Sequence, residues 1–173
     1  MTQAIRSIAL LDACVLYPAP IRDLLLHLAD QELYFPKWTD QIHQEWTGNL
    51  IQNRPDLSIG QLESTVSAMQ RAFPFANVSD FESLIQTIKL SDPNDAHILA
   101  AAIHCGANVI VTSNLKDFPV EYLAQFGIVP RHPDAFISKL VKSSPLGASS
   151  FYKPGFVFEK SFENISRSSN NNV

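Results

Sequence analysis

One stretch of the sequence decides the fold: SDPNDAHILAAAIHCGANVIVT, at residues 91–112. Asp92 is a favourable N-cap and Pro93 suits the first helical position, whereas Gly106 is a natural helix terminator. The helix predicted between them is rich in alanine and leucine, and its small side chains allow close packing. The run Ala107–Thr112 is apolar and β-branched, as is typical of a buried strand. The stretch therefore predicts a helix that leads into a central strand.

An aspartate lies in the first turn of this predicted helix. Asp95 takes the third helical position, where its carboxylate points out beside unpaired backbone N–H groups. A second aspartate, Asp12, ends the apolar run Ser7–Leu11, which predicts another buried strand. Ligands of open α/β sheets gather at the carboxyl ends of the strands, and right-handed crossovers put Asp12 and the loop Thr112–Asp117 on the same rim. The question is then which acidic residues meet Asp95.

The composition indicates one globular domain. The chain has 173 residues, of which 46% are hydrophobic and 17% are charged, as in globular rather than disordered proteins. The net charge of −4 argues against nucleic-acid binding by bulk electrostatics, although a divalent cation would invert the local field. Two distant cysteines, Cys14 and Cys105, do not make a disulfide framework or a zinc site, and we expect buried thiols. Because no signal peptide or 18-residue apolar run is present, we expect a cytoplasmic protein.

Short strands alternate with helices along the chain, which predicts the α/β class. The expected architecture is a three-layer α/β/α sandwich with a mostly parallel central sheet. The expected helices and extended segments follow in chain order: a turn at 13–20, helices at 22–32, 39–53, 58–72, 79–88, 121–126 and 134–141, and extended segments at 33–36, 73–78 and 127–129. We expect this domain at residues 1–145 and a C-terminal extension at 146–173, whose Ser- and Asn-rich end is predicted to be disordered.

Four acidic residues recur where predicted elements start or end, namely Asp12, Glu45, Asp95 and Asp117. Carboxylates brought within about 4 Å of one another repel by several kcal/mol unless a cation lies between them. Mg²⁺ and Mn²⁺ are the hard ions that prefer oxygen ligands, and they activate water for attack on a phosphodiester. Each acid also has a structural interpretation: Asp12 and Asp117 suit turns, Glu45 suits a solvated helix face, and Asp95 suits a helix N-terminus.

Residues 7–141 together resemble the PIN domain of metal-dependent ribonucleases, and within it the VapC-like toxin branch. The matching segments are Leu10-Leu11-Asp12, Glu45 on the second long helix, residues 92–102, and residues 110–118. The resemblance implies an α/β/α sandwich and cleavage of RNA with Mg²⁺ or Mn²⁺. It further implies that Asp12, Glu45 and Asp95 act as an acidic trio that binds the metal and catalyses the reaction. Many family members have Asp where this chain has Asn114, and Asp117 would then supply the fourth carboxylate.

Other residues of the loop after the second strand are candidates for supporting roles. Thr112 or Ser113 would hydrogen-bond a metal-binding carboxylate. Asn114 would contact substrate or metal-bound water through its amide, and Lys116 is the nearest basic candidate for a substrate phosphate. His97 and His104 lie seven residues apart without a third ligand, so we interpret them as packing or surface residues rather than as a zinc site.

The resemblance also implies partners: an RNA substrate, a cognate antitoxin of a bacterial type II system, and a second copy of the chain in a homodimer. Two other functions are compatible with the sequence. One is a PIN-like scaffold or regulator without catalysis, which the neutral Asn114 favours. The other is a phosphatase of the haloacid dehalogenase type, but that family needs a second Asp at the position of Cys14.

Overall fold

A four-stranded sheet forms the centre of the molecule, and all of its strand pairs are parallel. The computed structural model describes residues 5–144. Its strands are β1 (Ser7–Leu11), β2 (Tyr34–Lys37), β3 (Val109–Val111) and β4 (Val129–Arg131), in the spatial order β2-β1-β3-β4. The chain leaves β1 toward β2 and later returns to the other side of β1, so the strand order reverses between β1 and β3. This reversal is the place where open α/β sheets bind ligands.

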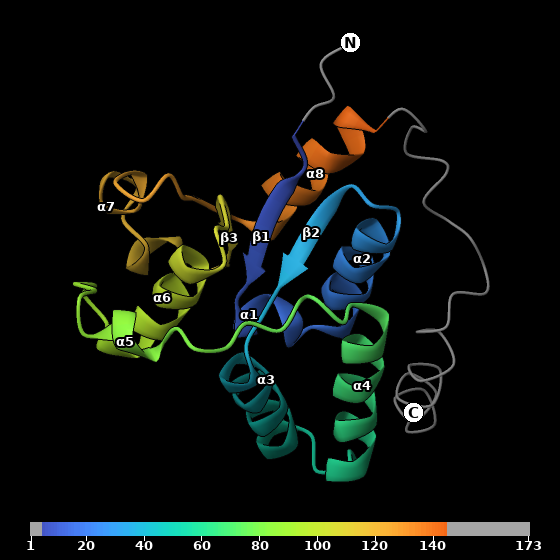
Figure 1. Ribbon diagram of the computed structural model, residues 1–173. Helices are drawn as coiled ribbons and strands as arrows, with labels where there is room; N and C mark the ends of the chain where they lie inside the picture. The colour runs from blue at the N-terminus through green and yellow to red at the C-terminus, as the bar shows by residue number, and fades with distance from the viewer. Residues whose placement is uncertain (1–4, 145–173) are drawn as a thin grey trace.

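Helices cover both faces of the sheet (Figure 1). On one face lie α2 (Ala19–Asp30) and α8 (Pro133–Ser143), which contact each other. On the opposite face α6 (Ala96–His104) packs on β1 and β3, and α7 (Val120–Ala124) packs beside β4. The predicted three-layer α/β/α sandwich is therefore confirmed, with a sheet that is wholly parallel.

Four further helices lie near the carboxyl ends of the strands. The single-turn helix α1 (Ala13–Leu16) follows β1 directly and contacts α3 (Asp40–Asn53). The helix α4 (Ile59–Ala72) packs along α3, and both extend below the sheet in Figure 1. The short α5 (Glu82–Ile85) contacts α6. These helices surround the end of the sheet at which Asp12 and Thr112 lie.

Several helix boundaries match the capping residues that the sequence offers. The Thr39 hydroxyl accepts from the backbone N–H of Ile42 at the start of α3. Ser58 and Gln61 form a reciprocal capping box at the start of α4. Gly106 takes a φ of 69° after α6, a left-handed conformation that glycine adopts without steric cost. The predicted starts of α3 and α4 and the predicted end of α6 are confirmed.

Other boundaries differ from the prediction. The extended segment expected at 73–78 is not a strand, because it makes only the single bridge Trp38–Asn77 to the sheet. Residues 13–16 form a helix rather than a turn, since the Asp12 side chain caps their first N–H. The helix expected at 79–88 is reduced to α5. The expected helix from Pro93 begins with a 3₁₀ turn, Pro93–Asp95, a frequent form of helix N-termini.

The core is one continuous cluster that joins the sheet to both helical layers. It includes Trp38 and Trp46, which are both fully buried. No helix within residues 5–144 is long and apolar enough to cross a membrane. The predicted C-terminal extension at 146–173 lies outside the described residues.

Candidate functional site

Asp12 lies where the strand order reverses, immediately after β1, and its carboxylate is firmly held. Oδ1 accepts from the backbone N–H of Ala13 at 2.7 Å. Oδ2 accepts from the Thr112 hydroxyl at 2.7 Å and from the Cys14 thiol at 3.3 Å. Thr112 follows β3, so the two neighbouring strand ends are joined through this carboxylate. Asp12 is only 8% exposed, and its hydrogen bonds therefore fix its orientation.

Hydrogen bonds that involve Thr112 and Cys14 also hold the loop after β3. The Thr112 hydroxyl accepts from the backbone N–H of Asn114 at 3.0 Å while it donates to Asp12. The Asn114 side-chain amide donates to Oδ2 of Asp117, the last residue of a 3₁₀ turn. Ser113 is exposed, and its backbone N–H donates to the Cys14 sulfur at 3.3 Å. Lys116 is exposed on the same turn. The loop therefore brings Asp117 to the rim that Asp12 occupies.

The pKa of Asp95 indicates that other acidic residues lie close to it. Its pKa is raised to about 6, first by burial and then by the negative charges of Asp12, Asp92 and Asp117, against a smaller opposing effect of His97. These four aspartates, Asp12, Asp92, Asp95 and Asp117, are called the acid cluster below. Asp92 caps the 3₁₀ turn by accepting from the backbone N–H of Asn94 at 2.9 Å. The acid cluster thus combines residues from three distant parts of the chain in one field of like charge.

Glu45 reaches the same side of the molecule from α3, but through a different contact. Its Oε1 lies 2.9 Å from Nε2 of His97 and 3.2 Å from Nε2 of Gln41. His97 is on α6, two residues after Asp95. Glu45 does not contribute to the raised pKa of Asp95. The structure therefore brings Glu45 to the helix that follows Asp95, without direct contact with the acid cluster.

The donors near the acid cluster suit a hard cation. They are carboxylate oxygens with one amide and one hydroxyl beside them, the ligand types that Mg²⁺ and Mn²⁺ prefer. The like charges around Asp95 would be neutralised by such an ion. Within residues 5–144, however, no group of three or more His, Cys, Asp or Glu side chains is already arranged as a metal cage. The predicted ligand roles of Asp12, Glu45, Asp95 and Asp117 stay predictions.

Two residues of the site were not assigned a role from sequence. Cys14 bridges the strand ends, and burial, followed by the charge of Asp12, raises the pKa of its thiol. His97 was interpreted as a packing or surface residue; it is buried, as a packing residue would be, and its ring also contacts Glu45. The sequence did contain a signal for this contact, namely a polar ring within an alanine- and leucine-rich helix. A buried imidazole needs a hydrogen-bond partner. His104, by contrast, is exposed.

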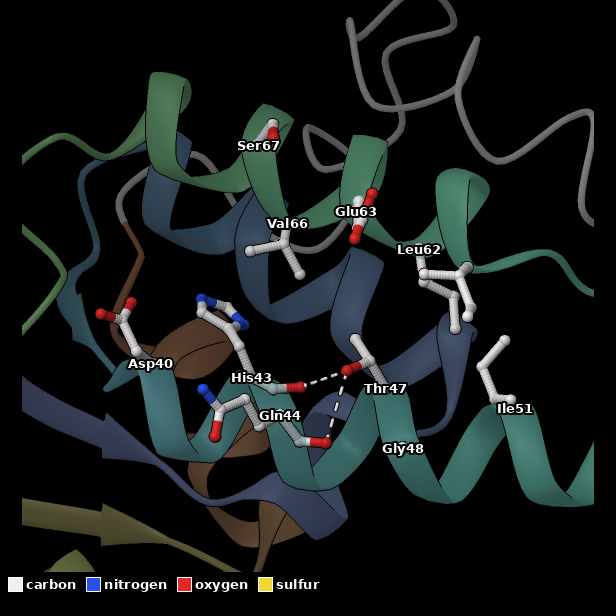
Figure 2. Close-up of a pocket in the computed structure, with 11 residues that line it drawn as sticks. Asp40, His43, Gln44, Thr47, Gly48, Ile51, Leu62, Glu63, Val66 and Ser67 are labelled. Atoms are coloured by element: carbon white, nitrogen blue, oxygen red, sulfur yellow. Dashed lines mark hydrogen bonds between the residues drawn. The ribbon is translucent and has the colours of Figure 1, made fainter.

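A groove lies elsewhere on the described chain. It has a volume of about 750 Å³ and runs between α3 and α4, with a mixed polar and apolar lining (Figure 2). Figure 2 shows His43 and Thr47 of α3 facing Val66 and Glu63 of α4, and Gln44 also lines the groove. Neither the acid cluster nor Glu45 lines this groove. The groove between α3 and α4 and the acid cluster are therefore two different places on the molecule.

Comparison with known proteins gives one short similarity. The chain is 51% identical over 43 residues to a protein of Mycobacterium tuberculosis (strain ATCC 25618 / H37Rv) named "Putative ribonuclease VapC50". The matched segment spans 25% of this chain and 25% of that protein. No family model matches the chain, and no solved structure matches it.

Proposed function

We propose that this protein is a metal-dependent endoribonuclease that cleaves RNA phosphodiester bonds. The observation that carries the proposal is the gathering of carboxylates where the strand order reverses: Asp12 is held there by Thr112, Asp117 by the loop after β3, and both charges act on Asp95. Carboxylates gathered at such a point suit a divalent cation and a phosphate-containing substrate. The short similarity to a protein named as a ribonuclease supports the same chemistry.

In this proposal Asp12, Glu45, Asp95 and Asp117 hold Mg²⁺ or Mn²⁺. When bound, the ion supplies Lewis-acid activation of water and neutralises the charge that develops on the phosphodiester. Thr112 keeps the Asp12 carboxylate in one orientation through its 2.7 Å hydrogen bond. Asn114 holds Asp117 through its amide. Lys116 lies exposed on the loop, where it would contact substrate phosphates.

We further propose that the protein is the toxin of a bacterial type II toxin–antitoxin pair and acts in the cytoplasm. The name of the similar protein supports this assignment. The partners would be an RNA substrate, a cognate antitoxin and a second copy of the chain. An antitoxin that covered the acid cluster would be expected to offer an arginine to its carboxylates, because guanidinium and carboxylate groups pair with two hydrogen bonds.

Replacement of one carboxylate tests the nuclease assignment. Purified protein with Mn²⁺ should cleave RNA, and Asp12→Asn should abolish cleavage because the uncharged amide is a poor ligand for a hard cation. Asp30→Asn is the matched control, because Asp30 is an exposed carboxylate at the last residue of α2. Undiminished cleavage by Asp12→Asn would overturn the assignment, and so would an equal loss in both variants.

A scaffold or regulatory module is the second candidate, and the neutral amide of Asn114 in the loop after β3 favours it. In that case the acid cluster would bind no ion and RNA would remain intact. Titration of the purified protein with Mn²⁺ separates the two functions. Saturable binding supports the nuclease, whereas an absence of binding supports the scaffold.

A further inference from the structure

The side chain of Glu45 is restrained at one oxygen and open at the other. Both of its hydrogen bonds go to Oε1, from His97 Nε2 at 2.9 Å and from Gln41 Nε2 at 3.2 Å. Within residues 5–144, Oε2 accepts no hydrogen bond. Glu45 is partly exposed, with 36% of its side-chain surface accessible. A glutamate on a helix surface ordinarily samples several rotamers, so two donors on one oxygen restrict where the other oxygen lies.

His97 is the stronger of the two restraints. Its side chain is 5% exposed, whereas Gln41 is exposed on the surface of α3. The imidazole is therefore held by packing within α6, and it cannot follow the glutamate into solvent. In contrast to a flexible surface partner, it loses little side-chain entropy when it makes the hydrogen bond.

The ring of His97 also has a defined donor. Nδ1 is buried and has no hydrogen-bond partner in the part of the chain that the structure describes. Nε2 faces a carboxylate oxygen, which only accepts hydrogen bonds, so Nε2 must carry a proton. Nε2 thus presents an N–H to Glu45, from a helix whose N-terminal end carries Asp95.

We propose that His97 is a positioning residue, which holds Glu45 so that its second oxygen is available to the divalent cation bound with Asp95. This inference rests on the proposed function and adds a role for a residue outside the acid cluster. His97 and Asp95 are two residues apart on one rigid segment. The hydrogen bond therefore links α3 to the same segment that supplies Asp95, and it fixes the separation between two carboxylates from distant parts of the chain.

Two substitutions of His97 separate positioning from packing. In His97→Gln the amide nitrogen lies near the place of Nε2, whereas in His97→Asn it lies near the place of Nδ1. Both variants lose the ring, but only His97→Gln keeps a donor for Glu45. We expect Mn²⁺ affinity, measured on the full chain by electron paramagnetic resonance of free Mn²⁺, to fall about 10- to 100-fold in His97→Asn and to be largely restored in His97→Gln.

A double-mutant cycle adds a test that packing alone would not pass. If His97 acts through Glu45, His97→Asn should have little further effect on Mn²⁺ affinity when Glu45→Gln is already present. Equal losses in His97→Gln and His97→Asn, or independent effects of His97→Asn and Glu45→Gln, would overturn the inference. The nuclease assignment would survive either result if wild-type protein still cleaves RNA with Mn²⁺. Absence of saturable Mn²⁺ binding by wild-type protein would overturn both.

A measurement on the unsubstituted protein covers the case in which the variants do not fold. The ¹⁵N resonances of the His97 ring in metal-free protein should show a protonated Nε2. The opposite tautomer would leave Glu45 without its donor and would overturn the inference. Saturable Mn²⁺ binding without RNA cleavage would contradict the proposed function but would leave the positioning role supported by the affinity data.

Discussion

Charged side chains gather in two places in this fold, and their charges are compensated in opposite ways. In the core, Arg22 is 1% exposed, donates to the backbone oxygens of Leu16 and Tyr17, and stacks 4.6 Å above the Trp46 ring. His43 accepts from the Trp46 indole N–H at 3.0 Å. These three side chains, Arg22, His43 and Trp46, are called the Arg22 cluster below.

In the Arg22 cluster the protein itself supplies acceptors for the guanidinium and for the Trp46 indole N–H. Carbonyl oxygens and an aromatic face surround the guanidinium, and burial lowers the pKa of His43 to about 4, so the imidazole is neutral at pH 7. In the acid cluster the nearest groups to Asp95 include three further carboxylates. The difference teaches that the charge of the Arg22 cluster is compensated from within the protein, whereas the acid cluster gathers like charges that a bound cation would neutralise.

The largest expected effect is a loss of activity from the acid cluster without a loss of stability. Asp95→Asn should lower Mn²⁺-dependent RNA cleavage about 10³-fold, because a charged ligand is removed. In metal-free protein at pH 7 the same change should raise the melting temperature by about 1–3 °C, because it removes a charge repelled by Asp12, Asp92 and Asp117. Assays of cleavage and thermal unfolding check both. A lower melting temperature would show that Asp95 serves folding after all.

The converse change addresses the Arg22 cluster. Arg22→Met should cost about 3 kcal/mol in the free energy of unfolding, because the carbonyl oxygens of Leu16 and Tyr17 lose their buried donor. Urea unfolding of metal-free protein measures it. A cost near zero would remove the contrast between the two clusters. Arg71→Met is the control, because Arg71 is exposed in the last turn of α4.

Thr112 shares features with both clusters. It is fully buried, like the Arg22 cluster, and its hydroxyl holds Asp12 of the acid cluster. Thr112→Val should lower cleavage about 10- to 100-fold through a less well oriented Asp12. It should also cost about 1–2 kcal/mol in stability, because the backbone N–H of Asn114 loses its acceptor. Thr112→Ser keeps the hydroxyl and should retain most of both properties. If Val and Ser behave alike, the hydroxyl does not orient Asp12.

The smallest expected effects concern the pH dependence of the free energy of unfolding in metal-free protein. Asp95 and His43 should change it in opposite directions. The pKa of Asp95 rises from 3.8 to about 6 on folding, so the native state binds more protons between these values and the contribution of Asp95 to stability falls as pH rises. The pKa of His43 falls from 6.5 to about 4, so the unfolded state binds more protons there and stability is lost as pH falls. The Asp95 contribution should be under about 1 kcal/mol, since the group is partly solvated.

Urea midpoints between pH 4 and pH 7 distinguish the two slopes. Asp95→Asn should make stability rise more steeply with pH than in wild-type protein, because the opposing contribution is gone. His43→Gln should flatten the same curve. Parallel curves for the three proteins would contradict both assignments.

Most strands of the sheet and most residues of the acid cluster could be predicted from the sequence, because both depend on local sequence patterns. Asp12 and Thr112 follow buried apolar runs, and parallel strands place the residues after them on one edge. The contact between Glu45 and His97 could not be predicted in this way, because it depends on how α3 packs relative to α6. The segment 73–78 was wrongly predicted as a strand because its apolar composition fits one, while pairing is a tertiary property.

The most direct test of the central claim is anomalous diffraction from crystals of the protein soaked in Mn²⁺. We predict a manganese peak within about 2.0–2.5 Å of carboxylate oxygens of both Asp12 and Asp95. A peak absent at saturating Mn²⁺, or present only away from these two residues, would contradict the account.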